Sequence, residues 1–163
     1  FGFFKILNLQ NDLINYFKKK GPEPFDKLFS SRYIKKKLFK KEKNIKNFLL
    51  DQSFISGIGN IYANEILYYS KINPFKSGKE ITKHQIEKLI KFSKYVLNKA
   101  IKKGGSTIKN FKNVKGKFGS YQKEFKVYDR EGKNCPRKNC NQKIIKFNIS
   151  NRSTFLCNNC QKY

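Results

Sequence analysis

The spacing of hydrophobic residues predicts several helices in the first two thirds of the chain. Over residues 25–39, apolar side chains recur on one side of a helix. Residues 45–55 predict a short buried helix, and residues 61–69 predict another that ends before Pro74.

A longer helix is expected from Thr82 to about Lys103. Thr82 and Gln85 have the spacing of a capping box, in which each side chain satisfies a backbone N–H of the first turn. Gly104 and Gly105 follow the last turn, as is usual where a helix ends. The apolar positions of this segment fall on one face: Ile86, Leu89, Ile90, Val96, Leu97, Ala100 and Ile101.

Other segments lack a helical period. Residues 1–9 predict the end of a strand and a connection, residues 104–120 a loop rich in Gly and Lys, and residues 124–128 a strand, because polar and apolar positions alternate there. The expected fold class is mostly α with a small β module. A helical block of about residues 25–104 would precede that module at about residues 120–163.

Two glycines mark a tight turn before the predicted helix at residues 61–69. Gly57, Gly59 and Asn60 would place backbone N–H groups and an amide beside an anion such as phosphate. A turn between two helices with no ligand is the alternative that these residues leave open.

All four cysteines lie near the end of the chain, in two close pairs. Two pairs separated by a hairpin-length gap are typical of a structural zinc site with four thiolate ligands and no open position. Disulfide bonds are the alternative, although paired cysteines also suit a reducing compartment that supplies metal. The expected ligands are Cys135, Cys140, Cys157 and Cys160.

The net charge of +26 arises from 37 basic and 11 acidic residues and favours a polyanionic partner. Almost all of the basic residues are lysines, so the codon bias of an AT-rich genome is an alternative explanation. Lys41 and Lys46 belong to a basic segment just before the glycine turn, where they could contact phosphates or form a solvated face.

The chain contains no Met and begins at Phe1, from which we expect a processed protein or a piece of a longer one. The sequence has no run of about 18 apolar residues that could cross a membrane. It also lacks a Gly-rich phosphate loop, a His-Glu-x-x-His motif and a Ser/His/Asp arrangement. The residues alone therefore indicate a nucleic-acid-binding module with a zinc hairpin.

Several motifs in order resemble the formamidopyrimidine-DNA glycosylases, bacterial repair enzymes for oxidised purines. The likeness covers nearly the whole chain and is closer than that to the related endonuclease VIII branch. The motifs are Gly-Pro-Glu-Pro at 21–24, Leu-Leu-Asp-Gln-Ser at 49–53, Gly-Ile-Gly-Asn-Ile-Tyr-Ala-Asn-Glu at 57–65, Gly-Gly-Ser-Thr at 104–107, Val-Tyr-Asp-Arg-Glu-Gly at 127–132 and Arg-Ser-Thr-Phe at 152–155.

This resemblance implies three parts. Residues 1–24 would be the tail of an N-terminal β-sandwich with its linker. Residues 25–119 would be a helix–two-turn–helix domain with a loop that covers the flipped base, and residues 120–163 a zinc-finger β-hairpin. The run Phe-Gly-Ser-Tyr-Gln at 118–122 departs from the family's usual Pro-Gly-Tyr-Phe, which affects its contacts with the base.

The resemblance also implies the reaction. Such a glycosylase/AP lyase removes oxidised purines (8-oxoguanine, formamidopyrimidines) from double-stranded DNA and cleaves at abasic sites, through an N-terminal proline amine that forms a Schiff base. That proline is absent from this sequence, so the chain alone is expected to be inactive. A non-enzymatic zinc-ribbon module, a decayed gene product and an endonuclease VIII-type enzyme are the alternatives.

Five residues acquire roles through the resemblance. Phe1 would be the aromatic wedge that enters the base stack, and Lys41, Lys46 and Asn60 would contact DNA phosphates. Arg152 would grip the phosphates beside the lesion and donate a proton in the final elimination. The family implies one structural zinc ion, damaged or abasic duplex DNA as partner, a monomer and the bacterial cytoplasm.

Overall fold

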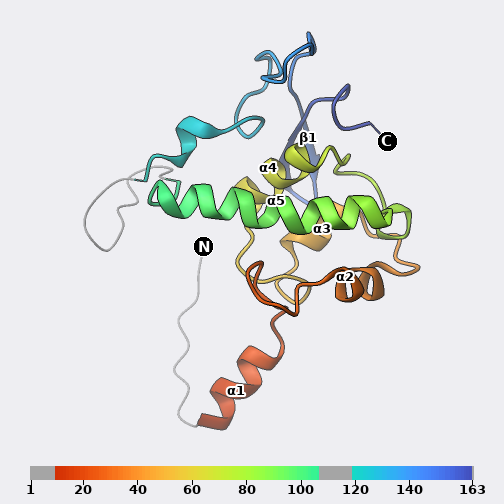
Figure 1. The fold of residues 1–163 in the computed structure, drawn as a ribbon, viewed down its shortest axis with the longest axis vertical. Coiled ribbons are helices and arrows are strands. Elements are labelled where there is room, and N and C mark those ends of the chain that lie inside the picture. Colours follow the sequence, from red (N-terminus) through yellow and green to blue (C-terminus); the bar gives the residue numbers. More distant parts are fainter. Residues whose placement is uncertain (1–9, 107–118, 163) are drawn as a thin grey trace.

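The computed structural model describes residues 10–106 and 119–162 as a block of helices with a two-stranded hairpin beside it (Figure 1). The helices are α1 (Gln10–Lys18), α2 (Ser31–Leu38), α3 (Ile45–Leu50), α4 (Asn60–Ser70) and α5 (Lys83–Lys102). Short 3-10 turns lie at Gly78–Glu80 and Tyr121–Glu124, and the strands are β1 (Ile145–Ile149) and β2 (Arg152–Leu156). The expectation of a mostly helical chain with a small β module is confirmed.

The long helix α5 crosses the front of the block in Figure 1 and packs against α4 and α2. Thr82 caps it: its side chain accepts a hydrogen bond from Gln85 N–H, and the Gln85 side chain accepts one from Thr82 N–H. The face that carries Ile86, Leu89 and Val96 is buried in the main core. The predicted capping box and helix are therefore confirmed.

Two of the predicted helices are shorter than expected. The helix predicted over residues 25–39 begins only at Ser31, because the Ser30 hydroxyl accepts a hydrogen bond from Tyr33 N–H and the preceding residues form turns. The helix predicted over residues 45–55 ends at Leu50, since Asp51 caps it and its carboxylate accepts a hydrogen bond from Ser53 N–H. Side-chain bonds to nearby backbone N–H groups thus set the start of one helix and the end of the other.

Helix α1 was not predicted. It projects from the end of the helical block that lies opposite to the hairpin (Figure 1). Its apolar side chains Leu13, Ile14 and Phe17 are exposed. Residues 1–9, including Phe1, lie outside the described residues, so the strand end expected there is not described.

The strand predicted over residues 124–128 is wrong. Glu65 of α4 is buried, and its carboxylate accepts hydrogen bonds from the backbone N–H groups of Lys126, Val127 and Tyr128 at 2.9–3.1 Å. These N–H groups are therefore unavailable to a neighbouring strand. The carboxylate instead fixes the start of the C-terminal module on α4.

Strands β1 and β2 form an antiparallel hairpin whose last pair is Ile149 with Arg152. Only Ser150 and Asn151 connect them, with φ of 48° and 59°. Two successive left-handed residues match the type I′ turn, whose twist suits a two-residue hairpin. Arg152 therefore stands at the tip of the hairpin.

The C-terminal module also contacts the C-terminal end of α4, through residues at the end of the module away from the hairpin tip. The Arg137 guanidinium donates to the carbonyl of Tyr68 at 2.5 Å and lies 4.5 Å over the Tyr68 ring. The Gln161 side chain accepts from Cys157 N–H and donates to the carbonyl of Ile72. In the described ranges, no helix has the length and apolar character needed to span a membrane.

Candidate metal centre and nucleic-acid interface

The four cysteine sulfur atoms converge at the base of the hairpin. Cys135 Sγ lies 3.8 Å from Cys160 Sγ, and Cys140 Sγ lies 3.6 Å from both Cys157 Sγ and Cys160 Sγ. All four lie within 4.8 Å of one another. A disulfide would place two of the sulfurs about 2.0 Å apart, so the cysteines are free in this arrangement.

This cluster fits a tetrahedral metal ion. Bonds of about 2.3 Å from zinc to four sulfurs give sulfur–sulfur distances of roughly 3.8 Å, close to those observed. The long spacing of the first pair is accommodated because Asn139 adopts a left-handed backbone conformation just before Cys140. A hydrogen bond from the backbone N–H of Gln142 is the main reason that the pKa of Cys140 falls to about 6.

At the other end of the hairpin, one carbonyl gathers three side chains from the helical block. The Ser153 carbonyl accepts from Lys46 Nζ at 2.9 Å, Asn60 Nδ2 at 3.1 Å and Asn64 Nδ2 at 3.4 Å. Asn64 Oδ1 also accepts from Phe155 N–H at 2.7 Å. Strand β2 is thus bound to α3 and α4 beside Arg152.

Lys46 is completely buried, which is rare for a lysine. Its ammonium donates to the Thr154 hydroxyl at 2.7 Å, and that hydroxyl donates to the carbonyl of Arg152 at 3.2 Å. Burial, and then the nearby charge of Arg152, lowers the pKa of Lys46 to about 8. Lys46 thus holds the backbone at Arg152 through the Thr154 hydroxyl. Arg152 itself is exposed.

The glycine turn lies at the start of α4. Gly57 has φ of 82°, a conformation that favours glycine, and its N–H donates to the Gln52 side chain, which in turn donates to the carbonyl of Ile58. Gly59 occupies the N-cap position of α4. It has no side chain that could accept a hydrogen bond from the first N–H groups of the helix. Asn60 therefore joins an uncapped helix start to the hairpin tip.

Three of the predicted site residues, Lys46, Asn60 and Arg152, come together here. Lys41 is exposed in the connection between α2 and α3, where its carbonyl accepts from Lys79 N–H. Phe1 and residues 107–118 of the predicted capping loop lie outside the described residues. Sequence reasoning missed the roles of Asn64 and Thr154, although the four-residue spacing of Asn60 and Asn64 places both on one face of a helix.

A family model described as the formamidopyrimidine-DNA glycosylase H2TH (helix–two-turn–helix) domain matches residues 20–112. The chain belongs to the formamidopyrimidine-DNA glycosylase family. This confirms the resemblance found in the sequence motifs.

Relatives from two bacteria illustrate the extent of the similarity. The formamidopyrimidine-DNA glycosylase of Rickettsia africae is 45% identical over 161 residues, which are 98% of this chain and 58% of the relative. That of Zymomonas mobilis is 43% identical over 148 residues, 91% of this chain and 54% of the relative. The chain thus spans somewhat more than half the length of these relatives.

Solved family structures share the fold. Lactococcus lactis Fpg in complex with DNA containing an abasic site has a TM-score of 0.86 and 36% identity, and the match covers 94% of this chain and 56% of that one. MutM from Thermus thermophilus has a TM-score of 0.83 and 30% identity, with 93% and 57% covered.

The buried ammonium of Lys46 makes stability depend on pH in a defined direction. Between pH 8 and 10.5 the unfolded chain holds this proton and the folded chain does not, so the free energy of unfolding rises with pH. We expect it to rise by about 1 to 2 kcal/mol more in the wild type than in Lys46→Met, because solvent near the tip screens part of the burial penalty. Urea unfolding at pH 7 and pH 10 measures both values.

Lys83→Met, at the exposed first turn of α5, is the matched control and should retain the wild-type pH dependence. Parallel pH profiles for wild type and Lys46→Met would show that Lys46 is not the buried titrating group.

Proposed function

We propose that this chain is the part of a DNA glycosylase/AP lyase that grips damaged double-stranded DNA, in a protein that removes oxidised purines. The observation that carries the proposal is the junction at Ser153, which holds exposed Arg152 beside Asn60 and the uncapped start of α4. A guanidinium, an amide and helix N–H groups together suit a phosphodiester backbone.

Two further observations support DNA as the partner. The net charge of +26 would attract a duplex and release its counterions. Solved structures of similar fold are Lactococcus lactis complexes with DNA that contains Fapy-dG or an abasic site. In this proposal Asn60 and Arg152 contact phosphates beside the lesion, and Arg152 donates the proton of the final elimination in the complete protein.

Lys46 and Lys41 take different parts. Lys46 has no exposed surface in the structure. We therefore propose that it positions the backbone of Arg152 through Thr154 and attracts phosphate at long range, without direct contact. Lys41 is exposed and free to follow the DNA backbone farther along the duplex. Phe1 retains the proposed role of an aromatic wedge.

Binding of DNA tests the interface. The purified chain should bind a duplex that carries a tetrahydrofuran abasic-site analogue, and Arg152→Ala and Asn60→Ala should each weaken binding roughly tenfold through the loss of a phosphate contact. Fluorescence anisotropy at a fixed salt concentration gives the dissociation constants.

Arg32→Ala on α2 and Asn98→Ala on α5 are the controls, because both residues are exposed and lie away from the hairpin. Equal affinity of the wild type and both site variants would contradict the assignment of Arg152 and Asn60.

The chain alone should form no covalent intermediate, since its sequence contains no N-terminal proline amine. We expect borohydride to trap no adduct between this chain and abasic DNA, while a full-length family member gives one under the same conditions. Electrophoresis under denaturing conditions detects the adduct. A trapped adduct on this chain would reveal a nucleophile among its own residues.

We propose that the metal is one structural zinc ion, held by Cys135, Cys140, Cys157 and Cys160 in a reducing compartment such as the bacterial cytoplasm. Elemental analysis should find about one zinc per chain and clearly less in Cys140→Ser. A chelator should unfold the hairpin and leave α2–α5 largely folded, which amide exchange can resolve. Another metal at full occupancy, or none, would contradict the proposal.

A further inference from the structure

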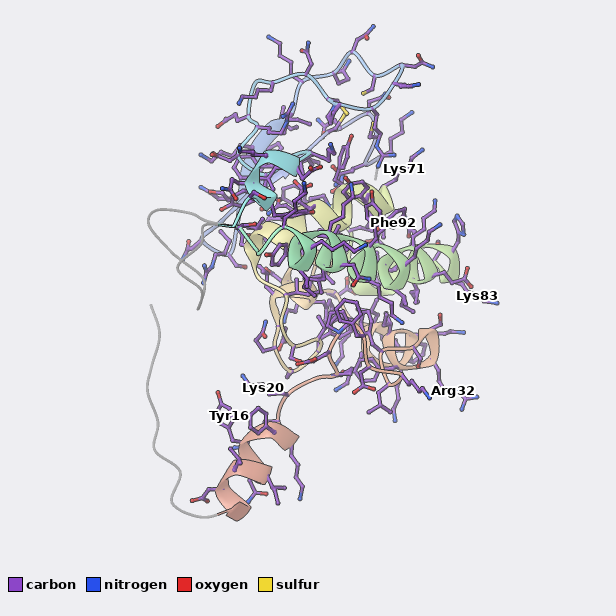
Figure 2. All side chains as sticks on the ribbon, turned by 60° about the vertical axis from the view of Figure 1, so that its left-hand side comes forward. Tyr16, Lys20, Arg32, Lys71, Lys83 and Phe92 are labelled. Carbon is purple, nitrogen blue, oxygen red and sulfur yellow. The ribbon has the colours of Figure 1, made fainter. Side chains whose placement is uncertain are left out.

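A groove lies between the end of α2, the 3-10 turn at Gly78–Glu80 and the first turns of α5. Its volume is about 530 Å³. Figure 2 shows α2, marked by Arg32, and the start of α5, marked by Lys83, on the same side of the molecule, and Figure 1 agrees. The lining residues are Lys35, Leu38, Phe39, Lys40, Glu42, Gly78, Lys79, Ile81 and Ile86.

The floor of the groove is apolar and one wall is an exposed aromatic ring. Leu38, Ile81 and Ile86 are buried and form the floor. Phe39 is 64% exposed. It is presented outward because α2 ends at Leu38 and Lys40, with φ of 54°, reverses the chain immediately afterwards. An aromatic side chain held at the edge of an apolar floor offers surface that a partner can bury.

The rim of the groove is positively charged. Lys35, Lys40 and Lys79 contribute three positive charges, and Glu42, the one acidic residue of this lining, pairs with Lys79 at 2.7 Å. The lining therefore keeps a positive balance around an apolar floor. Such a surface is complementary to a peptide that combines carboxylates with apolar side chains.

The groove uses none of the side chains that meet at Ser153. Arg152, Asn60 and Lys46 belong to the hairpin, α4 and α3, whereas the groove is built by α2, the turn and α5. A duplex backbone would neutralise the rim but has no apolar group with which to cover Phe39. We propose that this groove docks an acidic, amphipathic segment of a partner protein, with apolar side chains on Phe39 and carboxylates on Lys35 and Lys40.

Anisotropy of a labelled probe peptide tests this docking. The probe is a synthetic peptide in which Asp and Glu alternate with Leu and Phe, added to the complete chain at moderate salt. Saturable binding is expected, and Phe39→Ser should weaken it tenfold or more because the apolar contact is lost. Lys35→Glu should weaken it by a similar factor, since one attraction becomes a repulsion.

Matched variants distinguish binding in the groove from nonspecific apolar or electrostatic binding elsewhere on the chain. Phe17→Ser changes a ring of similar exposure, 60%, on α1, and Lys123→Glu makes the same charge change on a distant exposed lysine, so both should bind like the wild type. Affinity for the abasic duplex should be unchanged in Phe39→Ser, which keeps this test independent of the proposed DNA function.

Three outcomes would overturn the proposal. One is equal binding of the probe to wild type and Phe39→Ser. The second is equal binding of a control peptide with Ser in place of Leu and Phe, because charge alone would then explain the affinity. The third is complete displacement of the probe by equimolar duplex or single-stranded DNA, which would make the groove part of the nucleic-acid surface.

Discussion

The hydrogen bonds to the Ser153 carbonyl are the constraint on which the arrangement of this molecule depends. Lys46 comes from α3, Asn60 and Asn64 come from α4, and the acceptor lies on β2. A partly buried carbonyl and a buried ammonium are each costly without a partner, so the bonds between the strand and the two helices satisfy both groups. Because the acceptor is adjacent to Arg152, the bonds that join the two parts also place the residue proposed to contact DNA.

Glu65 provides a second attachment of the same kind. One buried carboxylate collects three successive N–H groups of the segment that leads into the cysteine module. Its pKa is raised by burial, and those N–H groups act in the opposite direction by favouring the charged form. Together with the bond from Arg137 to the carbonyl of Tyr68, it attaches the module to the middle and the C-terminal end of α4.

Much of this was predictable from residue types and spacing. The capping box at Thr82, the cysteine pairs and the glycine turn depend on local chemistry, and each is present as expected or in a compatible form. The strand expected at residues 124–128 failed because its N–H groups bind a glutamate some sixty residues earlier, and no local pattern indicates that contact. The burial of Lys46 has the same origin: its partners Ser153 and Thr154 lie more than one hundred positions away.

The two-residue turn at Ser150 and Asn151 has a consequence for how this hairpin can vary. Ile149 pairs directly with Arg152, so a residue inserted between them would lie in the loop and replace the type I′ turn by a three-residue connection, which commonly carries a bulge. The four sulfurs hold the other end of β2 through Cys157, so the register of the two strands would stay fixed and the strand could not slide to absorb the added residue. A change in loop length would therefore alter the twist at the tip and the angle at which Arg152 is presented, while Arg152 stays on the same face of the strand.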